Sequence, residues 1–206
     1  MKKFVLWLWL LALALPLLLL IMSACAARWA WPEILPSTFS LQGLMSVFSD
    51  STLSILGSSI LLSLTSAALT TLLSLPAARA LALLDFPGKT FVRALLLLPV
   101  LLPSTAYFIG LQTLFTRIRI IDTVGGVILS HCIVILPYTV WTLTDVTGSL
   151  GTRLEEQART LGASPSAVLR QVTLPLLIPA IFSVTALGFV VSFGQYFLTL
   201  MIGGGQ

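Results

Sequence analysis

The sequence predicts an all-α protein, a polytopic transmembrane helical bundle. The chain has 206 residues, of which 57% are hydrophobic and only 9% are charged. Its mean hydropathy is +1.06. A soluble chain of this size needs far more charged residues to cover its surface, so this composition indicates a membrane protein.

Five apolar segments are each long enough to cross a bilayer, which takes about 20 residues. They are Phe4–Ala26, Leu53–Leu75, Ala94–Phe115, Thr123–Val146 and Leu174–Leu200. The lipid bilayer is therefore the expected surroundings of most of the chain.

The first apolar segment follows Lys2 and Lys3, as in a signal peptide. Its length is that of a full span and exceeds a usual signal-peptide core, so we interpret it as a retained helix. We therefore divide the chain into residues 1–52, a transmembrane helix followed by a periplasmic segment, and residues 53–206, which hold the other spans.

The orientation follows from the lysines and arginines between the spans. With the N-terminus in the cytoplasm, eight of them fall on the cytoplasmic side and three on the outer side. The eight are Lys2, Lys3, Arg79, Lys89, Arg93, Arg153, Arg159 and Arg170, and the three are Arg28, Arg117 and Arg119. This bias predicts a cytoplasmic N-terminus and a cytoplasmic position for the polar segment 148–173. The basic residues form no block, so no nucleic-acid partner is expected.

Polar residues and prolines inside the spans allow two interpretations. His131, the only histidine, lies in the fourth predicted span, where an ionisable group suggests a pathway. A neutral histidine bonded to a neighbouring helix is the interpretation we favour. Pro137 either kinks this span or reflects the frequency of proline in membrane helices. Hydroxyl residues of the second span, among them Ser59 and Ser63, favour helix packing over a polar lining.

No constellation for catalysis or metal binding is visible in the sequence. There is no Ser/His/Asp arrangement that can be assigned to catalysis and no pair of buried carboxylates. Cys25 and Cys132 lie in apolar runs without partners at ligand spacing. A glycine-rich phosphate loop is also absent from the sequence, so the chain itself should not bind ATP. We expect no enzyme activity, no metal and no cofactor.

The segment from Glu155 to Pro179 is unusual for a loop between spans. Residues 155–159 favour a helix, which Gly162 interrupts. Ser164 and Pro165 then suit the N-cap and first position of a second helix. The sequence therefore predicts two short helices joined at a glycine, with one apolar side available to a partner.

This loop resembles the EAA motif of binding-protein-dependent ABC importer permeases, which have the MetI-like fold. The family pattern is Glu-Ala-Ala, three residues, Gly, nine residues and Ile-x-Leu-Pro. The matching residues here are Glu156, Gln157, Ala158, Gly162, Val172, Leu174 and Pro175, at the same spacing. Gln157 and Val172 depart from the usual Ala and Ile. The string 158–163 is especially similar to the thiamine, iron, polyamine and phosphonate branch.

The resemblance implies the permease subunit of an importer in the bacterial inner membrane. Its loop would sit in a groove of cytoplasmic ATPase subunits, and a periplasmic substrate-binding protein would deliver the cargo. A second permease copy or a paralogous half would complete the pathway. Gly162 would allow a sharp turn where a side chain would clash, and Glu156 would contact the ATPase or cap the loop. The plainer alternative is an amphipathic surface helix ending at a glycine.

Two other classes of function predict different sequence features. A secondary transporter driven by an ion gradient should have intramembrane carboxylates and no ATPase-binding loop. A membrane enzyme or signalling subunit should show a catalytic constellation. The family also has a further span after the one ending near Leu200, so residues 53–206 are expected to form a permease core without its last helix. A non-functional permease fragment is therefore a further alternative. The sequence does not identify the cargo.

Overall fold

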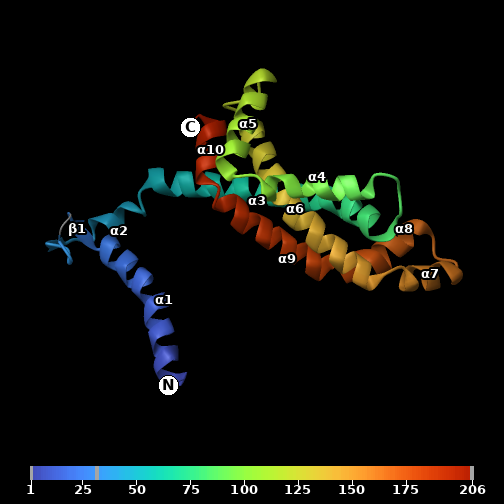
Figure 1. The fold of residues 1–206 in the computed structure, drawn as a ribbon, viewed down its shortest axis with the longest axis horizontal. Coiled ribbons are helices and arrows are strands. Elements are labelled where there is room, and N and C mark those ends of the chain that lie inside the picture. The colour runs from blue at the N-terminus through green and yellow to red at the C-terminus, as the bar shows by residue number, and fades with distance from the viewer. Residues whose placement is uncertain (1, 31–32, 205–206) are drawn as a thin grey trace. The chain divides into compact units, whose positions relative to one another are not determined.

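A computed structural model describes residues 2–30 and 33–204 of the chain. The chain divides into two compact units, Met1–Ser58 and Ser59–Gln206. Figure 1 shows that helices make up most of both units. This arrangement confirms the all-α class.

The first unit contains one long apolar helix and a small polar segment. Helix α1 (Lys2–Ala24) is followed by strand β1 (Ala26–Arg28), which pairs antiparallel with β2 (Thr38–Phe39). The short helix α2 (Gln42–Ser46) and the start of α3 (Asp50–Leu83) complete the unit. The strand pair lies between α1 and α2, in the segment that the sequence predicts to follow the first transmembrane helix.

The second unit is built on three long helices. They are the remainder of α3, α6 (Val124–Leu150) and α9 (Leu174–Phe193), and α6 packs along α9 (Figure 1). Small residues allow the close approach, because a Cβ at Gly188 would lie 3.3 Å from the Cβ of Ala67 and 3.0 Å from Ile135. Hydroxyl groups also join these helices, as in the 2.6 Å contact between Ser74 and Thr139.

The third predicted span, Ala94–Phe115, is not one straight helix. It consists of α4 (Lys89–Leu101) and α5 (Ser104–Arg117), which bend by 107° at the break between them. Leu102 has an extended backbone (φ −79°, ψ 143°). Pro103 explains this, because proline disfavours a helical residue before it and has no N–H to continue the helix.

The fifth predicted span, Leu174–Leu200, is also interrupted. Helix α9 ends at Phe193, and α10 (Tyr196–Gly203) begins after a break at Gly194 and Gln195. Helix α10 packs against α5 and α6 around a core that includes Phe108, Phe115 and Ile202. Counted by length and apolarity, the described residues offer four membrane-spanning helices, or five if the bent pair α4 and α5 forms one span.

Candidate functional site

The segment between α6 and α9 folds as a helical elbow at one end of the second unit (Figure 1). Helix α7 (Arg153–Thr160) and the short α8 (Pro165–Val168) form its two arms. A π-helical segment, Leu169–Thr173, joins α8 to α9 without a break. The second arm of the elbow is thus continuous with a long apolar helix, so a displacement of the arm would be passed directly to that helix.

Gly162 forms the bend between the two arms. Its φ is +86°, a left-handed conformation that side chains disfavour. A Cβ placed there would nevertheless meet no atom within 4 Å. The expectation that a side chain would clash at this turn was therefore wrong, and the reason for glycine is its backbone conformation.

Ser164 begins the second arm as an N-cap. Its hydroxyl oxygen accepts a hydrogen bond from the backbone N–H of Ala167 at 3.3 Å, and Pro165 occupies the first helical turn. This is the local structure that the sequence predicts from Ser followed by Pro. The cap fixes where the chain leaves the bend and re-enters a helix.

The motif residues are divided between surface and interior. Glu156, Gln157, Gly162 and Pro175 are exposed, whereas Ala158, Val172 and Leu174 are half-buried. Leu161, beside the bend, is 89% exposed. The elbow therefore presents polar groups and one prominent apolar side chain at its apex.

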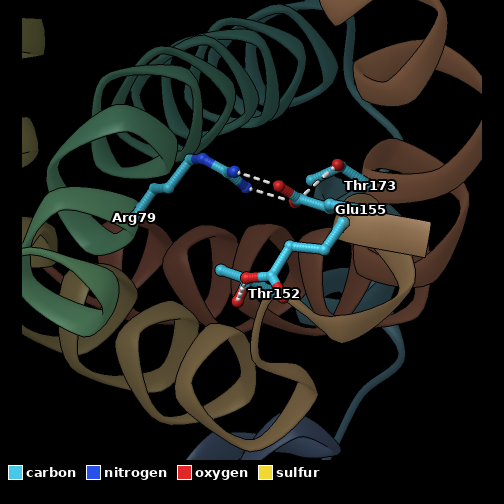
Figure 2. Close-up of polar contacts among 5 residues, drawn as sticks. Arg79, Thr152, Glu155 and Thr173 are labelled. Atoms are coloured by element: carbon cyan, nitrogen blue, oxygen red, sulfur yellow. Dashed lines mark hydrogen bonds and ion pairs between the residues drawn. The ribbon is translucent and has the colours of Figure 1, made fainter. Parts of the chain in front are cut away.

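A partly buried ion pair attaches the base of the elbow to α3, as Figure 2 shows. Both guanidinium nitrogens of Arg79 donate to the two carboxylate oxygens of Glu155, at 2.7 and 2.5 Å. The hydroxyl of Thr173, at the start of α9, donates to the same carboxylate at 2.7 Å. We name this group of three residues the clasp. It connects α3, α7 and the π-helical segment, which are distant in sequence.

The surroundings of Glu155 keep its carboxylate charged. The residue is only 6% exposed. Hydrogen bonds from Arg79, assisted by the one from Thr173, hold the pKa of Glu155 below its ordinary value, although burial works in the opposite direction. A bidentate arginine–carboxylate pair is also geometrically selective, so the clasp defines the position of α7 relative to α3.

Glu156, one residue further along, has a different environment. Its carboxylate accepts a hydrogen bond from the hydroxyl of Thr152 at 2.6 Å, at the N-terminal end of α7. A cavity of about 360 Å³ lies beside it, between the end of α3 and α7, and is also lined by Arg79 and Arg159. Glu156 thus lies at the edge of a solvent-accessible recess of mixed charge.

The clasp was missed by sequence reasoning. Arg79 appears there only in the charge count, and Glu155 only as a helix-favouring residue. The available signal was an arginine within the apolar continuation of the second span, because such a charge needs a partner. Its partner lies 76 residues away, and no local pattern identifies it.

The two intramembrane candidates, His131 and Pro137, lie apart from the elbow on α6. His131 is 1% exposed and its ring nitrogens lie 2.7 Å from the hydroxyl of Ser192 and 2.9 Å from that of Thr199. Pro137 is buried inside α6. Within residues 2–30 and 33–204, no three His, Cys, Asp or Glu side chains gather as a metal ion would require.

Comparison with known proteins adds a family match. Residues 71–206 match the model described as "Binding-protein-dependent transport system inner membrane component". The matched region includes the whole elbow, the clasp and the break between α9 and α10.

Individual relatives are similar over shorter stretches. The sulfate transport system permease CysT of Salmonella typhimurium is 33% identical over 131 residues, covering 58% of this chain and 47% of the relative. The molybdenum transport system permease ModB of Mycobacterium tuberculosis is 35% identical over 127 residues, covering 56% and 48%. The trehalose transport system permease SugB of the same species is 29% identical over 171 residues, covering 82% and 62%. The chain spans about half the length of the first two relatives.

Proposed function

The chain belongs to the binding-protein-dependent transport system inner membrane component family, and on this premise we propose that it is the permease subunit of an ATP-driven importer. It is a multi-pass membrane protein with several apolar helices. In the proposed mechanism, ATPase subunits grip the elbow between α6 and α9. Closure of the ATPase moves the elbow, and the long helices switch between outward-facing and inward-facing arrangements.

The observation that carries this proposal is an exposed elbow on a rigid base. Leu161 beside the bend and Gln157 on α7 are both exposed, so a partner can reach them. The clasp holds the base against α3 through a charged, bidentate contact. A segment that only connects two helices needs neither feature. A segment that transmits movement from a partner needs both an exposed contact surface and a fixed attachment to the long helices.

The family motif residues take definite roles in this proposal. Glu156, Gln157 and Ala158 form part of the contact with the ATPase, and Gly162 supplies the bend. Val172, Leu174 and Pro175 belong to the junction that passes the movement into α9. We further propose cytoplasmic ATPase subunits, a periplasmic substrate-binding protein and a second permease, either a copy or a paralogue, as partners, with the N-terminus in the cytoplasm.

Capture of an ATPase subunit tests this proposal. The full chain is co-expressed with candidate ATPase subunits of the same genome, and the bound ATPase is quantified after affinity purification. Gly162→Leu is expected to reduce capture at least fivefold, because a side chain at φ +86° costs about 1–2 kcal/mol and deforms the bend.

The matched control is Gly88→Leu. Gly88 precedes α4, has φ +87°, and like Gly162 has open space where a Cβ would lie. The backbone strain introduced by Gly88→Leu is therefore similar to that of Gly162→Leu, but Gly88→Leu does not alter the elbow. Equal capture by both variants would refute the coupling role of the elbow.

The narrower resemblance to the thiamine, iron, polyamine and phosphonate branch stays a prediction. The relatives above are described as sulfate, molybdenum and trehalose permeases. These names include oxyanions and a disaccharide, so the class of cargo has to be argued from the pathway itself.

A further inference from the structure

A cavity lies between α3, α4 and α6, toward the end of α6 that leads to the elbow. Its volume is about 200 Å³. Leu81 of α3 lines it together with Arg93 of α4 and with Trp141, Thr144 and Asp145 of α6. These residues belong neither to the clasp nor to the family motif, so the function proposed above leaves the cavity without a role.

The position of the cavity along α6 is close to the level of the lipid headgroups. Helix α6 has 27 residues and is therefore about 40 Å long, whereas the hydrocarbon core of a bilayer is about 30 Å thick. Asp145 lies five residues before the end of this helix, and Trp141 lies about one turn deeper. Trp141 is 40% exposed, and tryptophan is enriched at the boundary between hydrocarbon and headgroups.

Arg93 and Asp145 give the cavity one charge of each sign. Of the described residues that line it, these two alone are ionised at neutral pH. The guanidinium of Arg93 donates one hydrogen bond to the backbone carbonyl of Leu81 at 3.3 Å, which leaves most of its five N–H donors available. The ion pairs within residues 2–30 and 33–204 involve other side chains. The two charges therefore line one cavity without neutralising each other.

This pair of charges selects among the headgroups that a bilayer offers. An anionic headgroup would be attracted by Arg93 but repelled by Asp145, and a cation would meet the opposite combination. A zwitterionic phospholipid satisfies both, because its phosphate can accept hydrogen bonds from the arginine fork while its ammonium group contacts the carboxylate. Basic pockets between membrane helices bind headgroups in this way.

The acceptors around Asp145 favour a primary ammonium group. The hydroxyl of Thr144 donates to the backbone carbonyl of Val140 at 2.6 Å, so its oxygen can still accept a hydrogen bond inside the cavity. Together with the carboxylate of Asp145 it forms an acceptor site. Ethanolamine carries three N–H donors that match such a site, whereas the trimethylated nitrogen of choline carries none.

Apolar side chains deeper in the span offer a surface to the acyl chains, which a cavity of this size cannot hold. Val100 follows Arg93 by seven residues on α4, and Tyr138 precedes Trp141 by three residues on α6, so each lies on the same helix face. Val100 is 47% exposed and Tyr138 is 41% exposed. A lipid whose headgroup occupies the cavity could therefore lay its chains along α4 and α6.

We propose that this cavity is a binding site for phosphatidylethanolamine. The phosphate binds to Arg93, and the ammonium group binds to Asp145 and Thr144. The bound headgroup connects the start of α4 to the last turns of α6. This site is separate from the proposed contact with an ATPase and does not depend on it.

Native mass spectrometry of the purified full chain tests the site. The chain is delipidated in detergent and titrated with phosphatidylethanolamine, phosphatidylglycerol or phosphatidylcholine of identical acyl chains. Phosphatidylethanolamine is expected to bind at least about fivefold more tightly than either of the others, since only it can make both charged contacts. Equal binding of the three lipids, or a chain that binds none because a second copy covers the cavity, would overturn the proposal.

Asp145→Asn isolates the contact with the ammonium group. It should weaken phosphatidylethanolamine at least about fivefold without weakening phosphatidylglycerol, so that the preference between the two headgroups is lost or reversed. Asp85→Asn is the matched control, because the carboxylate of Asp85 is fully exposed and lies outside the cavity. Equal weakening of both lipids by Asp145→Asn would contradict the assignment of the ammonium group.

Arg93→Gln isolates the contact with the phosphate. Because the phosphate is common to all three lipids, this variant should weaken every one of them at least about fivefold. Arg117→Gln, at the exposed end of α5, should leave the affinities unchanged. Unchanged binding by Arg93→Gln would exclude the phosphate contact.

Excess glycerophosphoethanolamine separates a lipid site from a site for a soluble ligand. This compound has the same phosphate and ammonium group but no acyl chains. Phosphatidylethanolamine is expected to remain bound in its presence, because the chains contribute contacts with α4 and α6. Displacement of the lipid by the soluble compound would show that the headgroup alone is recognised and would overturn the lipid assignment.

Discussion

At the residue scale, the most consequential side chain outside the family motif is Glu155. It is buried, yet it is surrounded by three donors, two from Arg79 and one from Thr173. A buried carboxylate with fully engaged oxygens is stable, but loss of its partner leaves an uncompensated charge. A single substitution in the clasp should therefore change both the stability of the protein and the proposed coupling to the ATPase.

We predict that Glu155→Gln lowers the free energy of unfolding by about 1–3 kcal/mol at pH 7. This is less than for a fully buried pair, because the side chain of Arg79 is 35% exposed to solvent. The difference in unfolding free energy between this variant and the unchanged protein should depend on pH. Folding lowers the pKa of Glu155, so the stabilisation is complete above its ordinary value of 4.5 and is lost as pH falls through the folded pKa.

Thermal unfolding in detergent micelles between pH 7 and pH 3 measures this effect. The melting temperatures of the two proteins should converge at the acidic end. Lys89→Ala is the matched control, because it removes an ion pair with Asp85 whose carboxylate is fully exposed. If the difference in melting temperature between Glu155→Gln and unchanged protein stays constant with pH, the charge of Glu155 is not what stabilises the base of the elbow.

At the scale of elements, helix breaks and close packing shape the second unit. The bends at Pro103 and at Gly194 turn α5 and α10 toward one another, where they share a core with α6. Elsewhere α3, α6 and α9 approach closely over small residues. Such packing replaces the hydrophobic driving force that is missing between helices in lipid.

We predict that Gly188→Val destabilises the contact of α9 with α3 and α6 by about 1–3 kcal/mol, the usual cost of overpacking. The new Cβ would lie 3.0 Å from Ile135 and 3.3 Å from Ala67, both tightly packed. Gly110→Val in α5 is the control, because no atom lies within 4 Å of its added Cβ. Urea or thermal unfolding of the two variants should rank Gly188→Val as the less stable, and the reverse order would contradict the packing model.

At the scale of the whole molecule, the proposed function depends on which side of the membrane the elbow faces. The lysine and arginine bias, eight against three, predicts a cytoplasmic position for it. ATP-driven subunits can reach it only there. Orientation is thus the property on which the proposed ATPase contact and the proposed direction of transport both depend.

We predict opposite labelling of two engineered cysteines in intact cells. In a chain with Cys25→Ser and Cys132→Ala, Gln157→Cys should resist a membrane-impermeant maleimide until the cells are lysed. Arg117→Cys, at the exposed end of α5, should react at once. Immediate labelling of Gln157→Cys would place the elbow on the outer side and exclude contact with a cytoplasmic ATPase.

The sequence alone determined the membrane class, the elbow and the position of its bend. These features depend on local properties: hydropathy over a span, a Ser-Pro start, and a glycine where the backbone turns. Each is encoded within a few neighbouring residues, so each could be predicted from them. The bend at Gly162 was placed correctly, although its cause is the left-handed backbone and not a clash.

The tertiary structure alone decided the clasp, the two helix breaks and a cavity beside α10. The clasp joins residues 76 positions apart, and the cavity collects side chains from four helices. Contacts of this kind depend on which helix faces pack together. Hydropathy does not specify those faces, because all sides of an apolar helix have similar hydropathy. Ser63 illustrates the difference: in sequence it is one hydroxyl among many, and only packing buries it in the wall of a cavity.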